Sequence, residues 1–356
     1  MKTITYSAIP IDAGQVHGWK DIPINGAADP DPLVPLGPLS SEANMAITSS
    51  IYFGEHSNSP YAEDKNRLQG SLLTLFARRS VVRRLLAAEQ LLPPGHHLLV
   101  FDAYRTSQVQ KSLYDSYKRK LKEKWPGMDN EALDAETQKY VSIPSTDPTK
   151  PSPHNTGGAV DVVIVKLDRA GERELQNLRS QLAARTISFA KRVGLEIQLS
   201  AIIRHHGTML DFGTPFDHGS EKSALTYYEA KIAAGEDLTA NEMRACNNRR
   251  LLFKVMLQAG FQPYSAEWWH FNAPESQMGA ATSGQKVATF GAITLDEGSI
   301  QHEKTRLHVH QESLRLHAEG CQGKVQDAFQ AEILAAIQGS GDIRLAAKWP
   351  AEIIAP

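Results

Sequence analysis

Two short segments, residues 151–161 and 266–271, constrain most strongly what this chain can fold into. The first reads PSPHNTGGAVD and the second AEWWHF, and together they contain His154, Asp161 and His270. Two imidazoles and one carboxylate form a ligand set that suits Zn²⁺ and leaves a fourth position open for water. A metal site made from them requires a fold that brings these two distant segments into contact.

Glu267 precedes His270 by three positions in the second segment. A free carboxylate beside a metal site is what metal-assisted hydrolysis needs as a general base. The aromatic neighbours Trp268, Trp269 and Phe271 favour a strand, and residues three apart in a regular strand point to opposite faces. Both side chains therefore reach one site only if the backbone bends or bulges between Glu267 and His270.

The overall composition is that of an ordinary globular protein. Of 356 residues, 41% are hydrophobic and 22% are charged, and the formal net charge is −2. The near-neutral charge argues against a nucleic acid or an anionic membrane as the main partner, and two cysteines are too few for a disulfide framework. No apolar run approaches the ~18 residues that span a bilayer, and the N-terminal residues lack the apolar core of a signal peptide, so we expect a cytoplasmic protein.

The spacing of apolar residues predicts helices alternating with a few short strands. Helices are expected at about residues 68–92, 107–125, 172–193, 223–234 and 241–260. Strands are expected at 97–103 and 159–167, and five prolines within 20–40 predict an extended arm on the surface. This pattern indicates an α+β fold with a small, mainly antiparallel sheet packed with helices, rather than a doubly wound parallel sheet.

Taken singly, the polar residues also fit ordinary structural roles. Asp161 lies among aliphatic residues, where a salt-bridged or capping carboxylate explains it as well as a metal does. His154 alone is typical of a surface loop. Arg105 ends a strand-like run and suits the stabilisation of an oxyanion, and Asp217 suits a substrate ammonium, but a structural arginine and a capping aspartate are equally ordinary.

Five segments in order resemble the zinc D-alanyl-D-alanine dipeptidases of the VanX type. They are DAYR at 102–105, SPHNTGGAVD at 152–161, GTPFD at 213–217, NRRLL at 248–252 and EWWHF at 267–271. Each segment is a weak signal, but the ordered set is specific. The resemblance covers roughly residues 45–294.

This resemblance implies a role for each polar residue of the segments. His154, Asp161 and His270 are expected to bind one Zn²⁺ per chain, with Glu267 as catalytic base. Arg105 corresponds to the residue that stabilises the transition state.

The resemblance also implies how the substrate and the domains are arranged. Ser152 and Asp217 fall near the site for the substrate's free amino group. The catalytic domain, at 45–294, is expected to have a zinc peptidase fold like that of D,D-peptidases and hedgehog-like domains, with a helical insertion at about 172–207. A proline-rich arm (1–44) precedes it, and a partly helical segment (295–356), a candidate for self-association, follows it.

The expected reaction is zinc-dependent hydrolysis of D-Ala-D-Ala, or of a closely related D-configured dipeptide, to free amino acids. One alternative is a zinc D,D- or L,D-carboxypeptidase that acts on cell-wall peptides. Another is a non-catalytic zinc-binding module of the same fold. The sequence leaves open whether the physiological role is antibiotic resistance or recycling of cell-wall dipeptides.

Overall fold

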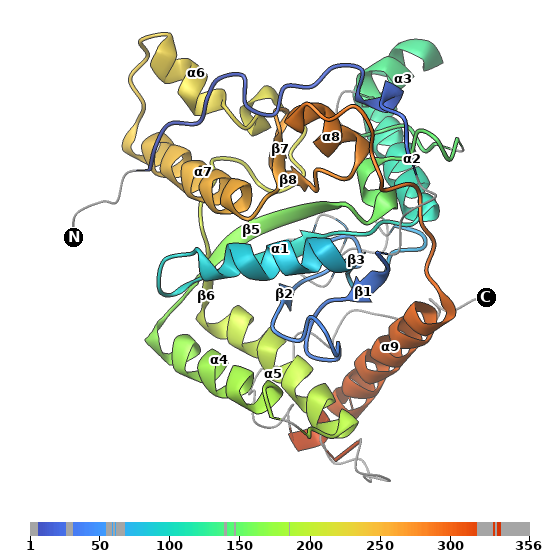
Figure 1. Cartoon of the computed structure of the whole chain (residues 1–356), viewed down its shortest axis with the longest axis vertical. Coiled ribbons are helices and arrows are strands. Elements are labelled where there is room, and N and C mark those ends of the chain that lie inside the picture. Colours follow the sequence, from blue (N-terminus) through green and yellow to red (C-terminus); the bar gives the residue numbers. More distant parts are fainter. Residues whose placement is uncertain are drawn as a thin grey trace.

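A six-stranded sheet and a separate two-stranded sheet lie at the centre of the protein in its computed structural model (Figure 1). The structure describes residues 6–25, 31–54, 59, 61, 68–138, 141–145, 147–184, 186–318, 330–331 and 333–335. The larger sheet contains β2 (Ile47–Thr48), β4 (His96–Asp102), β5 (Ala159–Leu167), β6 (Gly207–Met209), β7 (Gln262–Tyr264) and β8 (Glu267–Asn272). The smaller sheet pairs β1 (Leu33–Pro35) with β3 (Phe76–Arg78).

The larger sheet has the strand order β2-β4-β5-β8-β7, and β6 pairs with β5. Only the β2–β4 pair is parallel among the described strands, and the other pairs are antiparallel. The predicted α+β class with a mainly antiparallel sheet is therefore confirmed. The central strand β5 is buried along its length except at Lys166, which agrees with its run of β-branched aliphatic residues.

Helices cover the sheet and its ends. The helices of the first half are α1 (Arg79–Gln90), α2 (Ser107–Lys124), α3 (Asn130–Thr137) and α4 (Arg169–Leu182). Those of the second half are α5 (Phe189–His206), α6 (Tyr227–Ala233), α7 (Ala240–Gln258), α8 (Gln277–Ser283) and α9 (Glu297–Ala318). Helices α1 and α7 contact each other and pack on β4 and β8 respectively, whereas the α4–α5 pair packs on β5 (Figure 1).

Three sequence predictions need correction. The helix expected at 68–92 begins only at Arg79, because residues 76–78 form β3 and pair with β1. The single helix expected at 172–193 is two helices, with Ser188 capping the start of α5 through its hydroxyl. The arm expected on the surface is largely buried in its second part, where Val34 and Leu36 join the main hydrophobic core.

The C-terminal helix α9 packs against the preceding part of the chain. The carboxylate of Glu303 accepts hydrogen bonds from the backbone N–H groups of Leu73 and Thr74, each at 2.8 Å. Arg306 pairs with Glu196 of α5 at 2.6 Å and donates to the carbonyl of Leu73. These buried hydrogen bonds and the buried ion pair hold α9 against both α5 and the segment before β3. Self-association through residues 295–356, and the domain boundaries expected above, stay predictions.

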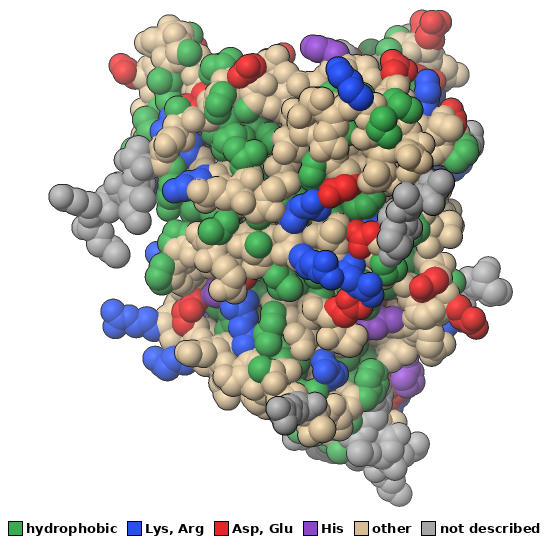
Figure 2. Space-filling model, in the orientation of Figure 1, with side chains coloured by type: hydrophobic (Ala, Val, Ile, Leu, Met, Phe, Trp, Pro, Cys, Tyr) green, Lys and Arg blue, Asp and Glu red, His purple; other side chains and the backbone are tan. Residues whose placement is uncertain are grey.

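Charged side chains of both signs are mixed on the face shown in Figure 2. Basic side chains over α1 lie beside acidic ones: Arg79 pairs with Glu42 at 2.5 Å, and Arg84 pairs with Glu275 at 2.5 Å. The charges of Arg79 and Arg84 are thus balanced by neighbouring carboxylates. Within the described residues, no helix is long and apolar enough to cross a membrane.

A buried histidine links α1 to α4. His97 Nδ1 lies 2.8 Å from Glu89 Oε1, and His97 Nε2 lies 2.6 Å from Glu172 Oε1. Burial alone would lower the pKa of His97, but the two carboxylates outweigh it and raise the pKa. The imidazolium therefore joins two helices to the end of β4.

We expect His97→Gln to destabilise the protein in a pH-dependent way. Because the folded-state pKa of His97 is raised, its stabilising effect is complete below the unfolded pKa of about 6.5 and is lost as the pH rises through the folded pKa. The free energy of unfolding should fall by about 1–2 kcal/mol at pH 6, and by less at pH 9. Urea unfolding of both proteins at the two pH values measures this, and an equal loss at both would contradict it.

Candidate active site

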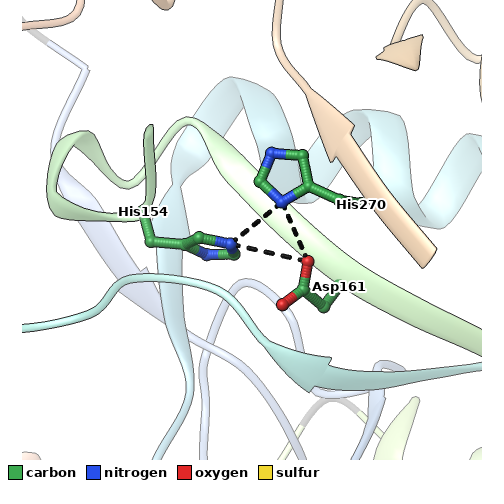
Figure 3. A group of neighbouring side chains, drawn as sticks. All are labelled: His154, Asp161 and His270. Carbon is green, nitrogen blue, oxygen red and sulfur yellow. Dashed lines mark hydrogen bonds and ion pairs between the residues drawn. The ribbon is translucent and has the colours of Figure 1, made fainter. Parts of the chain in front are cut away.

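Three side chains from distant parts of the sequence meet beside β5 (Figure 3). His270 Nδ1 lies 3.0 Å from Asp161 Oδ1 and 3.2 Å from His154 Nε2, and His154 Nε2 lies 3.5 Å from Asp161 Oδ1. One ligand atom from each residue falls within 4.8 Å of the others, and all three side chains are buried. Among the described residues, no other group of three or more His, Cys, Asp or Glu side chains has this spacing.

The local fold explains how the three residues meet. Asp161 of β5 is paired directly with His270 of β8 across the antiparallel ladder, so their side chains are neighbours on one face. His154 lies in a short 3-10 turn (Pro153–Thr156) that ends at Gly157 with φ 69°. A Cβ at Gly157 would lie 2.5 Å from Leu33, so glycine permits both the left-handed backbone and the close packing that leads into β5.

Both imidazoles are oriented in the way that metal-binding histidines are. His154 donates through Nδ1–H to the carbonyl of Ala103 at 2.7 Å, which leaves the Nε2 lone pair directed at the cluster. His270 contacts Asn272 Oδ1 through Nε2 at 3.2 Å and turns Nδ1 inward. This set of two imidazole nitrogens and one carboxylate oxygen fits a zinc ion.

Asp161 carries its charge inside the protein. Burial alone would raise its pKa, but His154 and His270 outweigh burial and hold the pKa well below its usual range. Asp161 is 2% exposed, and a carboxylate so buried requires partners of opposite charge. Its ionised carboxylate therefore offers an anionic oxygen to a metal ion.

The irregularity expected between Glu267 and His270 is present. Neighbouring residues of β7, Pro263 and Tyr264, lie opposite Phe271 and Glu267 of β8, so the register shifts between them. The shift brings Glu267 Oε2 to 3.8 Å from His270 Nδ1. Burial, with repulsion from nearby carboxylates, raises the pKa of Glu267 to about 8. A carboxyl group with a raised pKa therefore lies beside the cluster of His154, Asp161 and His270.

Arg105 lies beside Asp161 of the cluster and is almost fully hydrogen-bonded. Its Nε and Nη2 donate to Asp102 Oδ2 at 3.1 and 2.7 Å, Nη1 donates to Gln110 Oε1 at 2.8 Å, and Nη2 donates to the hydroxyl of Tyr52 at 3.0 Å. Nη2 is also 3.9 Å from Asp161 Oδ2. Since a guanidinium has five N–H groups, these four bonds within the described residues leave one N–H on Nη1 for another acceptor.

Ser152 and Asp217 line the same cavity as the cluster. The Ser152 hydroxyl is 3.4 Å from Gln110 Oε1. Asp217 accepts a hydrogen bond from the Tyr61 hydroxyl at 2.6 Å and has φ 58°, a left-handed conformation that few non-glycine residues adopt. Burial raises the pKa of Asp217 to about 6. Its backbone conformation is held by the surrounding packing, as is common at functional sites.

All seven residues singled out from the sequence line one cavity of about 200 Å³. The seven are Arg105, Ser152, His154, Asp161, Asp217, Glu267 and His270. A second cavity of about 400 Å³ adjoins it, and Asp217, Glu267 and Trp269 line both. The sequence did not single out Tyr52 and Tyr61, whose rings lie 5.3 Å apart beside Arg105 and Asp217, because no local pattern marks these tyrosines.

Comparisons with known proteins point to one family. A model of the peptidase M15 family, described as D-Ala-D-Ala dipeptidase, matches residues 171–287. A D-alanyl-D-alanine dipeptidase of Synechocystis sp. is 26% identical over 277 residues, which cover 73% of this chain and 92% of the relative. The chain is thus similar to the D-Ala-D-Ala dipeptidase family. The resemblance found in the sequence and the expectation of a peptidase are both confirmed.

A second member of the family gives a shorter match. The D-alanyl-D-alanine dipeptidase of Escherichia coli K12 is 35% identical over 71 residues, or 20% of this chain and 31% of the relative. The family match at 171–287 includes Asp217, Glu267 and His270, whereas Arg105, His154 and Asp161 precede it. In the structure, the residues inside the matched range and those that precede it line the same cavity.

Proposed function

We propose that this protein is a zinc-dependent dipeptidase that hydrolyses D-Ala-D-Ala, or a closely related D-configured dipeptide, to free amino acids. The observation that carries the proposal is one cavity in which a buried His-Asp-His cluster adjoins Glu267, Arg105 and Asp217. The Synechocystis relative, which the chain matches over 92% of that protein's length, supports the dipeptide as substrate. A cytoplasmic location remains a prediction from the sequence.

One zinc ion per chain would be held by His154, Asp161 and His270. The donor set supports zinc because it combines imidazole nitrogen with a carboxylate and leaves room for exogenous ligands in the cavity. When bound, zinc supplies Lewis acidity at the scissile carbonyl. The remaining chemistry belongs to side chains of this protein.

Glu267 acts as the general base and then as the general acid. It takes a proton from the attacking water while the water oxygen bonds to the carbonyl carbon, and it delivers a proton to the leaving nitrogen as the C–N bond breaks. Each turnover thus consumes one water and returns Glu267 to its starting state. Its position 3.8 Å from His270 Nδ1 supports this role, because the base must lie beside the metal ligands.

Arg105 stabilises the oxyanion that forms on the scissile carbonyl. Its contacts with Asp102, Gln110 and Tyr52 fix the guanidinium before the reaction, so little reorganisation is needed when charge develops. The remaining Nη1–H is the donor that we assign to the oxyanion. Asp102 also lies 3.1 Å from His154 Nδ1 and so couples Arg105 to a metal ligand.

Asp217 binds the ammonium group of the dipeptide, with the Ser152 hydroxyl as a second contact. Asp217 is a partly buried carboxylate with no cationic side chain in direct contact among the described residues, and it is therefore well suited to an incoming ammonium. The hydrogen bond from Tyr61 holds Asp217 in place. A free amino terminus is then a requirement for tight binding.

We expect Asp217→Asn to raise KM about ten- to a hundredfold and to remove a pH dependence. The pKa of Asp217 is raised to about 6, so the binding carboxylate is lost as the pH falls through that value. In the unchanged protein, KM should therefore rise below pH 6, whereas in Asp217→Asn it should be high and flat across the same range. Initial rates from pH 5 to pH 8 measure this, and equal KM profiles would remove Asp217 from ammonium binding.

The substrate class is tested by a panel of D,D-, L,D- and L,L-dipeptides, each assayed with zinc and with a chelator. We expect D-Ala-D-Ala to be cleaved fastest and the chelator to abolish cleavage. If zinc-loaded protein cleaves no member of the panel, the protein is instead a zinc-binding module.

The second cavity favours one alternative, a carboxypeptidase that acts on longer peptides. It lies beyond Asp217, where an extension on the substrate's amino side would lie. The discriminating substrate is N-acetyl-D-Ala-D-Ala, which lacks the ammonium. A dipeptidase should cleave it far more slowly than D-Ala-D-Ala, and equal rates would favour the carboxypeptidase.

A further inference from the structure

A free dipeptide has a carboxylate as well as an ammonium, and the carboxylate also needs a partner. Moving an unpaired carboxylate from water into a protein cavity is costly. The described residues that line the first cavity include three acids, Asp161, Asp217 and Glu267, but only two permanent cations, Arg105 and Lys20. Arg105 already forms an ion pair with Asp102. Lys20 is therefore the lining cation that no carboxylate of the described residues pairs with.

The two cavities indicate where each end of the dipeptide lies. Asp217 and Glu267 line both cavities and therefore mark the junction between them. Trp19, Lys20 and Met278 line the first cavity and are absent from the lining of the second. The wall that contains Lys20 is thus distinct from the junction at which the ammonium would bind.

This wall is firmly attached to the rest of the site. Trp19 and Lys20 belong to a short 3-10 helix (Trp19–Asp21) of the N-terminal arm. The side-chain amide of Gln277, which is 2% exposed, donates to the carbonyls of Ile22 at 2.6 Å and Thr149 at 2.9 Å. Gln277 thereby joins the arm to the loop that leads into Ser152 and His154.

A second anchor follows directly in the sequence. Ile24 forms a parallel bridge with Ala288, with backbone hydrogen bonds of 2.8 Å from Asn25 N to Ala288 O and 2.9 Å from Ala288 N to Pro23 O. Lys150 pairs with Asp21 at 3.6 Å. The arm is therefore held directly after Lys20, which keeps the loss of backbone freedom on binding small.

The side chain of Lys20 is half-buried, and its charge is available. Its Nζ lies 5.3 Å from the centre of the Trp19 ring. In the described part of the chain, no ion pair joins Lys20 to a carboxylate. Its flexible stem carries three N–H donors, which form strong hydrogen bonds with carboxylates.

We propose that Lys20, presented by the N-terminal arm, binds the carboxylate end of the dipeptide and so makes a free C-terminus a requirement. This inference rests on the proposed function, because it assumes a dipeptide whose ammonium lies at Asp217. It assigns the arm a role in substrate recognition. A peptide extended at its C-terminus would move its carboxylate away from Lys20 and leave a neutral amide there.

Binding measurements with two matched ligands test the proposal. In zinc-loaded Glu267→Gln, which should not consume the ligand, calorimetry gives Kd for D-Ala-D-Ala and for D-Ala-D-Ala amide. Adding Lys20→Met should raise Kd for the acid at least about tenfold and leave Kd for the amide within about twofold. Lys150→Met is the control, because Lys150 contacts the same arm through Asp21 but does not line the cavity.

The outcomes separate this inference from the proposed function. Suppose that D-Ala-D-Ala binds, and that Lys20→Met either leaves its Kd unchanged or weakens binding of the acid and the amide equally. Lys20 then does not bind the carboxylate, while the dipeptidase proposal stands. If Lys150→Met weakens acid binding as much as Lys20→Met does, the arm acts by its position alone, and the inference is also overturned. If neither ligand binds any variant, the dipeptidase proposal and the inference fall together.

Discussion

Replacement of Glu267 by glutamine should lower kcat for D-Ala-D-Ala by about a thousandfold while the protein still binds one zinc ion. Glutamine keeps the size and the hydrogen-bonding reach of the side chain but cannot accept the proton of the attacking water. His154, Asp161 and His270 are untouched, so the metal site persists. Steady-state kinetics together with metal analysis of the same sample measure both effects.

The matched control is Glu221→Gln, the same chemical change at an exposed residue that lines the second cavity. It should leave kcat within about twofold. Turnover close to that of the unchanged protein in Glu267→Gln would remove Glu267 from the mechanism. Loss of zinc together with turnover would instead make Glu267 a part of the metal site.

Replacement of His270 by alanine should abolish both zinc binding and hydrolysis. Of the three ligand atoms, His270 Nδ1 lies nearest to the other two, at 3.0 Å from Asp161 Oδ1 and 3.2 Å from His154 Nε2. Without it, two donors remain, which is fewer than the three protein ligands of a typical catalytic zinc site. Activity should fall below detection, and added zinc should no longer raise Tm, whereas it should raise Tm of the unchanged protein.

His17→Ala is the control for this variant, because His17 is an exposed histidine outside both cavities. It should keep the increase in Tm with zinc and the full rate of hydrolysis. A His270→Ala protein that still binds zinc stoichiometrically would show that the metal is held elsewhere. That result would contradict the assignment of the three-residue cluster.

Much of the site was predictable because its residues lie in short segments with strong local signals. Asp161 lies in an aliphatic strand, His154 precedes two glycines, and His270 lies in an aromatic strand. The three-residue step from Glu267 to His270 even required a backbone irregularity, which the register shift between β7 and β8 supplies. The roles of these residues in catalysis remain predictions.

Other features depend on contacts between distant parts of the chain. The apolar spacing of residues 76–78 continues that of α1 and predicts a helix, yet pairing with β1 makes them a strand. The partners of Arg105 and Asp217 include Tyr52 and Tyr61, from a segment with no recognisable motif. The position of Lys20 depends on the amide of Gln277, which follows it far along the sequence.

The central claim is that a zinc ion held by His154, Asp161 and His270 makes this protein a D-Ala-D-Ala dipeptidase. Its most direct test is a titration of metal-depleted protein with zinc, in which the release of D-alanine from D-Ala-D-Ala is followed. The rate should rise linearly from zero and level off at one zinc per chain. Equal rates with and without zinc, or no release of D-alanine at full zinc loading, would contradict it.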